Sequence, residues 1–156
     1  MNKKIRRIYI DTTVVYGAPA KKFAENSKQF WHAVRNGEIT IIVSDVLEEE
    51  LKRAPTHIRA SLETVPESQI ERVVSTPESN ALAALYIAES VVGKSSLDDC
   101  RHIALATIAH ADAIASWNFL HIVDRRDDYN IVNEKLGYPK IKIQTPNQNE
   151  ATNDDT

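Results

Sequence analysis

Short runs of β-branched and other apolar residues alternate along the chain with longer segments in which apolar residues recur every three or four positions. The short runs predict strands, and the longer segments predict helices. Strands are expected at 5–10, 39–43, 70–75, 113–117 and 141–143. Because strands alternate with helices, the pattern predicts an α/β fold in which helices cover both faces of a parallel sheet.

Capping residues and helix breakers set the expected helix boundaries. The predicted helices are one from Thr12-Thr13, one over 21–35 closed by Asn36-Gly37, one capped by Ser44 or Asp45, one over 77–93, and one over 97–110 capped by Ser95-Ser96. Pro55 either ends the third of these or starts a further helix through Leu62. A short helix or turn is expected over 118–123.

The chain has 156 residues, which fits one domain with a single core. It shows no internal repeat and no linker, so we expect one domain over 1–146. The remaining segment, 147–156, is polar and acidic, and we expect it to be disordered.

Composition limits the cellular compartments and the kinds of binding partner that fit the protein. A single cysteine, Cys100, excludes a disulfide framework and zinc sites built from several thiolates, which favours a reducing cytosol. No apolar run is long enough for a signal sequence or a membrane span, so a cytoplasmic protein is expected. The net charge of −3 argues against a protein that grips nucleic acid by charge alone. It argues less against a nuclease, because clustered acids that bind cations also lower the net charge.

Several polar residues follow predicted strands, where sites form in open parallel sheets. Asp11 ends the first strand, and a carboxylate there is costly unless a cation or hydrogen bonds compensate it. A helix N-cap is an equally good interpretation of Asp11 taken alone. Asn118 follows a later strand and carries an amide oxygen that can face a metal ion or its waters.

Two further acidic groups open helices, where the helix dipole alone would favour them. Of Glu48, Glu49 and Glu50, only one can point squarely at a site, and Glu50 is selected, with Glu49 as the fallback. Asp99 shares a helical face with His102, for which a structural role is expected. A surface or capping role is likewise expected for His121.

These candidates are rich in carboxylates and poor in imidazoles and thiolates. Hard oxygen ligands suit Mg²⁺ or Mn²⁺ rather than zinc. The chain carries no Walker loop, no GxGxxG and no GxSxG motif. The residues therefore predict an acidic metal site at the edge of a parallel sheet.

Four segments in order resemble the PIN domains, and in particular the VapC-like group, the toxin halves of toxin–antitoxin pairs. They are 8–14 (IYIDTTV), 43–51 (VSDVLEEEL), 99–106 (DCRHIALA) and 116–122 (SWNFLHI). The resemblance implies a three-layer α/β/α sandwich with a mainly parallel sheet, a ribonuclease that uses Mg²⁺ or Mn²⁺, an RNA substrate, a possible antitoxin partner and a possible homodimer.

Carried over by position, the resemblance implies that Asp11, Glu50 and Asp99 are metal ligands and that Asn118 joins them in the catalytic site. Many PIN domains have a fourth acid where this chain has Asn118. That difference puts a second metal ion in doubt more than a first.

Two alternatives remain open. In one, the acidic site is degenerate, and the protein acts by binding an antitoxin-like partner or nucleic acid without cleaving it; Asn118 and the acidic balance favour this interpretation. In the other, Asp11 accepts a phosphoryl group. That chemistry would require a second acid two residues later or a distant lysine, and position 13 is Thr.

Overall fold

A five-stranded, wholly parallel sheet forms the centre of the computed structural model, which describes residues 5–17 and 23–146. The strands are β1 (Arg6–Ile10), β2 (Ile39–Ser44), β3 (Ile70–Val73), β4 (Ala113–Ala115) and β5 (Lys142–Gln144). Their order across the sheet is β3-β2-β1-β4-β5. The segment expected to be a disordered tail, 147–156, lies outside the described residues.

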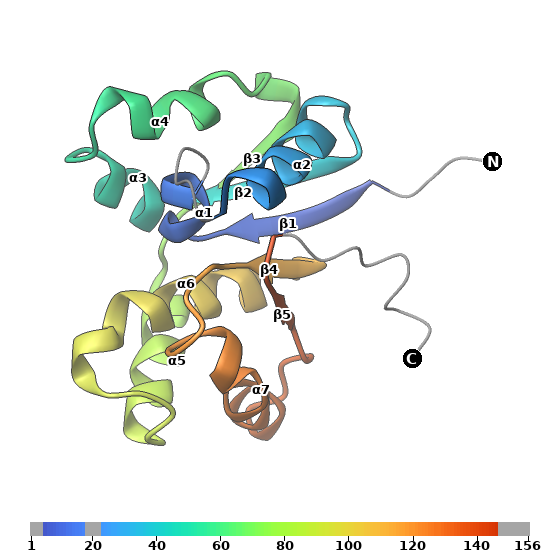
Figure 1. Ribbon diagram of the computed structural model, residues 1–156. Helices are drawn as coiled ribbons and strands as arrows, with labels where there is room; N and C mark the ends of the chain where they lie inside the picture. Colours follow the sequence, from blue (N-terminus) through green and yellow to red (C-terminus); the bar gives the residue numbers. More distant parts are fainter. Residues whose placement is uncertain (1–4, 18–22, 147–156) are drawn as a thin grey trace.

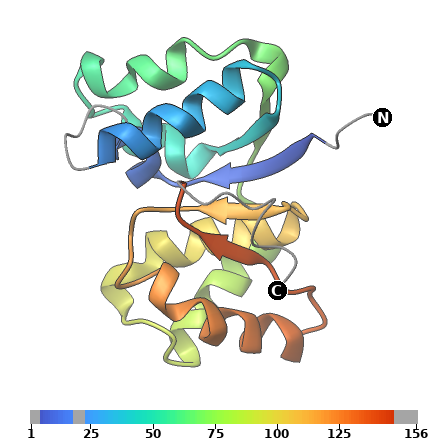
Figure 2. The same ribbon diagram turned by 45° about the vertical axis from the view of Figure 1, so that its right-hand side comes forward.

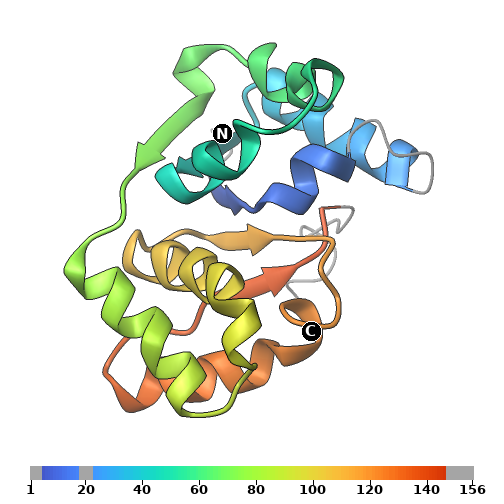
Figure 3. The same ribbon diagram turned by 90° about the vertical axis from the view of Figure 1, so that its left-hand side faces the viewer.

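Helices cover both faces of this sheet (Figure 1). One layer contains α1 (Thr12–Gly17), α2 (Ala24–Arg35), α3 (Asp45–Leu51) and α4 (Thr56–Glu63). The other contains α5 (Pro77–Ala88), α6 (Leu97–Ile108) and α7 (Arg126–Lys135). The two layers are also separated in Figures 2 and 3. Short 3-10 helices, η2 (Glu67–Gln69), η3 (Lys94–Ser96) and η4 (Val123–Arg125), precede β3, α6 and α7. The predicted α/β/α sandwich is confirmed.

Each face of the sheet has its own apolar core, as alternation along β1 shows. Ile8 and Ile10 pack with α1, α2, α3 and α4, whereas Tyr9 between them packs with α5, α6 and α7. Successive side chains of a strand point to opposite faces, and all three are almost wholly buried. Burial on both faces explains why the central strands β1, β2 and β4 contain continuous apolar runs in the sequence.

The strand order places a switch point at the centre of the sheet. The chain moves from β1 outward to β2 and β3, and later returns to the other side of β1 for β4 and β5. The segments that leave β1 and β4 therefore diverge at neighbouring positions, which is where ligands bind in open α/β sheets. Asp11 and Ser116 are the first residues after these two strands.

The predicted end of α5 at Gly93 was wrong. The helix stops at Ala88, and Ser90 adopts a left-handed conformation with φ of 64°. The backbone N–H of Val91 donates to the carbonyl of Tyr86, and that of Ser90 donates to Ile87, as in a Schellman motif. Because serine takes the position that glycine usually occupies, no residue type in the sequence indicates this stop.

Helix α7 was not predicted from the sequence. This helix is polar over most of its surface, and its buried residues are only Tyr129, Val132 and Asn133. The periodic signal is therefore weak, and tertiary packing decides the conformation. β4 is also two residues shorter than expected, because the chain leaves the sheet after Ala115. Within residues 5–17 and 23–146, no helix is long and apolar enough to cross a membrane.

Candidate active site

Asp11 lies between β1 and α1 and is only 2% exposed. Its Oδ1 accepts hydrogen bonds from Thr13 Oγ1 at 2.6 Å and from the backbone N–H of Val14 at 3.3 Å. Its Oδ2 accepts one from Ser116 Oγ at 2.5 Å. The contact with Val14 is that of an N-cap, so the capping role considered from the sequence is real. Capping uses Oδ1 of Asp11, so Oδ2 remains available to accept the hydrogen bond from Ser116, which follows the neighbouring strand β4.

Burial raises the pKa of Asp11 above its ordinary value. The charge of His102 and the hydrogen bonds from Ser116 and Thr13 lower it, but they do not fully offset the loss of water. Ionised Asp11 thus carries negative charge that the surrounding protein compensates only in part. A cation placed next to it would favour the ionised form.

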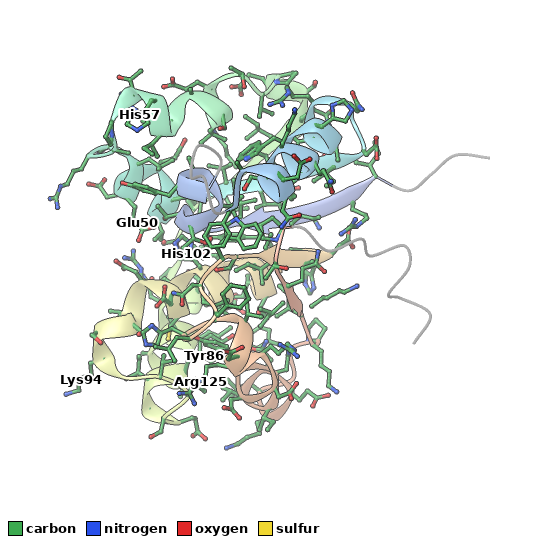
Figure 4. The ribbon with its side chains drawn as sticks, viewed as in Figure 1. Glu50, His57, Tyr86, Lys94, His102 and Arg125 are labelled. Atoms are coloured by element: carbon green, nitrogen blue, oxygen red, sulfur yellow. The ribbon has the colours of Figure 1, made fainter. Side chains whose placement is uncertain are left out.

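Glu50, on α3, points toward the same region, whereas Glu49 points away. The Glu50 side chain is 30% exposed, and its Oε1 accepts a hydrogen bond from Thr12 Oγ1 and lies 2.9 Å from His102 Nε2. Figure 4 shows Glu50 and His102 next to each other between the two layers of helices. The Glu49 side chain is 71% exposed and pairs with Lys52. The choice of Glu50 over Glu49 therefore agrees with the direction of the two side chains.

His102 connects Glu50 to the centre of the sheet. Its Nδ1 lies 2.7 Å from the Tyr9 hydroxyl, which lies 2.7 Å from Ser44 Oγ. Ser44 in turn accepts the backbone N–H of Leu47 and caps α3, the helix that carries Glu50. The predicted structural role of His102 thus has a definite form: it positions the Glu50 carboxylate.

His102 also favours the ionised form of that carboxylate. Burial opposes ionisation of Glu50, but the hydrogen bond and charge of His102, together with the Thr12 hydroxyl, outweigh it and lower the pKa. Glu50 is therefore held as an anion.

Asp99, in the first turn of α6, completes the acidic group. Asn118 Nδ2 donates to its Oδ1 at 3.3 Å, and His121 Nδ1 lies 3.9 Å from its Oδ2. Burial raises the pKa of Asp99, and so does repulsion by Asp11 and Glu50, while His102 and His121 oppose the shift. Asp99 therefore lies close enough to both Asp11 and Glu50 to feel their charges, although the three carboxylates come from distant parts of the sequence.

Three hydroxyl groups in this region were not among the predicted site residues. Thr12 binds Glu50, Thr13 and Ser116 bind Asp11, and Thr13 Oγ1 also accepts the backbone N–H of Trp117 at 2.8 Å. Ser116 Oγ accepts the backbone N–H of Asn118 at 2.9 Å. A signal did exist, because each hydroxyl lies within two residues of Asp11 or Asn118 in the sequence. That Ser116 contacts the Asp11 carboxylate can be seen only once β4 is known to lie beside β1.

The donor set suits a hard divalent cation by chemistry and by charge. Asp11, Glu50 and Asp99 offer only carboxylate oxygens. Burial raises the pKa of Asp11, and burial together with the charges of Asp11 and Glu50 raises that of Asp99, so a cation would favour the ionised form of both. In the part of the chain that the structure describes, no group of three His, Cys, Asp or Glu side chains is already arranged as metal ligands are. The fit is thus one of donor type and electrostatics.

The chain resembles a known protein in its structure but not in its sequence. No protein-family model and no curated protein sequence matches the chain. Among solved structures, the chain is similar to the crystal structure of Mycobacterium tuberculosis VapC20, a toxin that cleaves the sarcin-ricin loop. The TM-score is 0.53, and the match covers 86% of this chain and 98% of that chain.

The fold is PIN-like. The resemblance noted in the sequence is confirmed at the level of the fold, over most of the chain. Sequence identity to VapC20 is 14%, so the PIN-like match concerns architecture, and activity has to be argued from this chain's own residues.

Proposed function

We propose that this protein is a divalent-metal-dependent endoribonuclease of the VapC-like toxin type, which hydrolyses phosphodiester bonds in RNA. The observation that carries the proposal is that Asp99 lies close enough to Asp11 and Glu50 for their charges to raise its pKa, beside the carboxyl ends of the central strands. Like charges are costly to gather in a partly buried place, and titratable groups perturbed in this way are typical of functional sites. The PIN-like fold supports the same conclusion.

In this proposal Asp11, Glu50 and Asp99 hold Mg²⁺ or Mn²⁺, directly or through water, and Asn118 lies beside Asp99. The ion supplies Lewis acidity, which lowers the pKa of water and stabilises charge on the phosphate. The protein supplies position. Thr13 and Ser116 fix Asp11, His102 fixes Glu50, and Asn118 donates to Asp99.

Cleavage of structured RNA tests this function directly. We expect end-labelled RNA to be cut with Mn²⁺ or Mg²⁺ and to remain intact with EDTA, when both are resolved on a denaturing gel. A protein purified from cells that express the Asp11→Asn variant serves as the control for contaminating nucleases. Cutting of equal extent in EDTA would contradict the metal requirement.

Replacing Asn118 by Asp restores a fourth acid next to Asp99. We expect the metal-free variant to melt at a lower temperature, because the amide donor to Asp99 is replaced by a repelling carboxylate. We expect it to bind Mn²⁺ about tenfold more tightly, within the range found for groups next to metal ligands. Isothermal titration and thermal melts with and without Mn²⁺ measure both effects. An unchanged affinity for Mn²⁺ would place Asn118 outside the metal's surroundings.

A second candidate function is binding without cleavage, and a specific observation favours it. The described residues hold no preformed set of three metal ligands, and the fourth position is an amide. In that case the protein would act by binding an antitoxin-like protein or RNA. An antitoxin partner and a homodimer belong to both proposals; co-purification with the product of a neighbouring gene and light scattering test them.

A further inference from the structure

A cavity of about 290 Å³ lies next to the acidic residues, on the side of α1. Its lining consists of aromatic and small side chains, and it includes two of the hydroxyl residues described above. The lining residues are Thr12, Thr13, Tyr16, Gly17, Phe23 and Trp117. This volume is at the lower end of the range for small-molecule sites, so the cavity suits one ring system rather than a large ligand.

The cavity has a preformed aromatic wall. The rings of Phe23 and Trp117 are stacked with centroids 4.2 Å apart and planes inclined by 12°. Gly17 allows Trp117 to lie against α1, since a Cβ at position 17 would come within 2.7 Å of the indole Cδ1 and Nε1 atoms. Tyr16 adds a third aromatic residue, which is partly exposed to solvent. Flat, rigid aromatic faces favour a flat ligand over a flexible aliphatic one.

Two residues that line the cavity also contact the carboxylates of the candidate active site. Thr12 lines the cavity and donates to Glu50, while Thr13 lines it and donates to Asp11. Thr13 also accepts the backbone N–H of Trp117, so the position of the indole is tied to that of the Asp11 carboxylate. A ligand in the cavity would therefore contact Thr12 and Thr13, which in turn contact the two carboxylates proposed to bind metal.

We propose that this cavity receives an unpaired nucleobase of the RNA, adjacent to the phosphodiester that is cut. The inference rests on the proposed ribonuclease function and adds a base-binding site to it. Stacking on aromatic side chains accepts any base and strengthens binding by about tenfold for each base. It also requires the base to leave its helix, so single-stranded loops are the expected targets. The wall of Phe23 and Trp117 thus selects unpaired RNA.

Fluorescence of 2-aminopurine tests this site without relying on cleavage. A short single-stranded RNA carries the probe at one position, and binding is measured in Mg²⁺ with the Asp11→Asn variant, so that the RNA stays intact. We expect strong quenching at one probe position only, because stacking on an aromatic ring quenches this base. Adding Phe23→Leu, which keeps apolar bulk but removes the ring, is expected to relieve the quenching and weaken binding about tenfold.

Phe119→Leu is the matched control. Phe119 lies in the turn after Asn118, is 46% exposed and does not line the cavity. Its loss should leave both the quenching and the affinity unchanged. Gly17→Ala is a second probe, because the added methyl group forces Trp117 to shift while Phe23 remains. Melting temperatures of all variants show that they are folded.

The outcomes separate this inference from the proposed function. Quenching that is equal in the Phe23→Leu and parent proteins, or an equal loss with Phe119→Leu, would overturn the nucleobase site. Tighter binding of a fully paired duplex than of the single strand would overturn it too. Cleavage by the wild-type protein is scored separately, so a nuclease without this base site and a base-binding protein without cleavage give different results.

Discussion

Asp11→Asn is expected to reduce metal-dependent RNA cleavage by more than about 100-fold, the upper end of what loss of a group that orients a metal costs. The metal-free variant should melt at the same temperature as the wild type or at a higher one. The two effects have one cause, because the charge that would attract the cation is also the charge that burial penalises. Gel assays of cleavage and thermal melts in EDTA measure them.

The substitution should be well tolerated because the hydrogen bonds of Asp11 survive it. An Asn oxygen can accept from Thr13 and from the N–H of Val14, as Oδ1 does now. The new amide group can donate to Ser116 Oγ, which takes the acceptor role in place of the donor role. Wild-type cleavage by this variant would exclude Asp11 as a metal ligand. A large fall in melting temperature would show that its charge stabilises the fold.

The difference in melting temperature between Asp11→Asn and the wild type should also depend on pH in a defined direction. The pKa of Asp11 in the folded protein is raised above its unfolded value, so the folded state binds this proton more tightly. This group therefore destabilises the folded protein progressively as pH rises from about 4 through its raised pKa. The melting-temperature advantage of Asp11→Asn in EDTA should grow over that window and then level off. A difference that shrinks with rising pH would contradict the raised pKa.

Glu50→Gln is expected to reduce cleavage by more than about 100-fold as well, whereas Glu49→Gln should change it less than about twofold. Glu50 faces His102 and Thr12 beside Asp99, and Glu49 pairs with Lys52 in solvent. The two variants make the same chemical change on neighbouring residues of one helix. Cleavage rates under matched Mn²⁺ concentrations distinguish them.

This pair of variants also separates charge from structure. Gln at position 50 keeps an oxygen for the Thr12 hydroxyl, so the hydrogen bond is retained while the negative charge is lost. Melting temperatures close to that of the wild type would assign the lost activity to charge. Equal activity of both variants, or greater damage from Glu49→Gln, would remove Glu50 from the proposed site.

The sequence predicted the sheet well because the central strands β1, β2 and β4 are mostly buried on both faces and read as apolar runs. It also indicated Asp11 as a candidate, since a polar residue that directly follows a buried strand stands out. It did not predict α7, whose mainly polar residues bury only a few side chains. Nor did it predict the end of α5, where Ser90 takes a conformation that glycine usually adopts.

The hydrogen-bond partners of the acidic residues could not be predicted from the sequence, for a different reason. Ser116 binds Asp11 across 105 positions of sequence, and His102 binds Glu50 across 52. No local pattern carries such information, because it depends on which strands become neighbours. Helical spacing placed His102 on the same face as Asp99, but it could not show that His102 contacts the Glu50 carboxylate.

The position of β1 at the centre of the sheet has a consequence for synthesis on the ribosome. Asp11 leaves the ribosome early, yet its hydrogen-bond donor Ser116 and the neighbouring strand β4 come from the last third of the chain. Pairing over such a distance forms late, because a long loop has to close first. Under the proposed ribonuclease function, a growing chain could therefore not cut RNA until most of it has been synthesised.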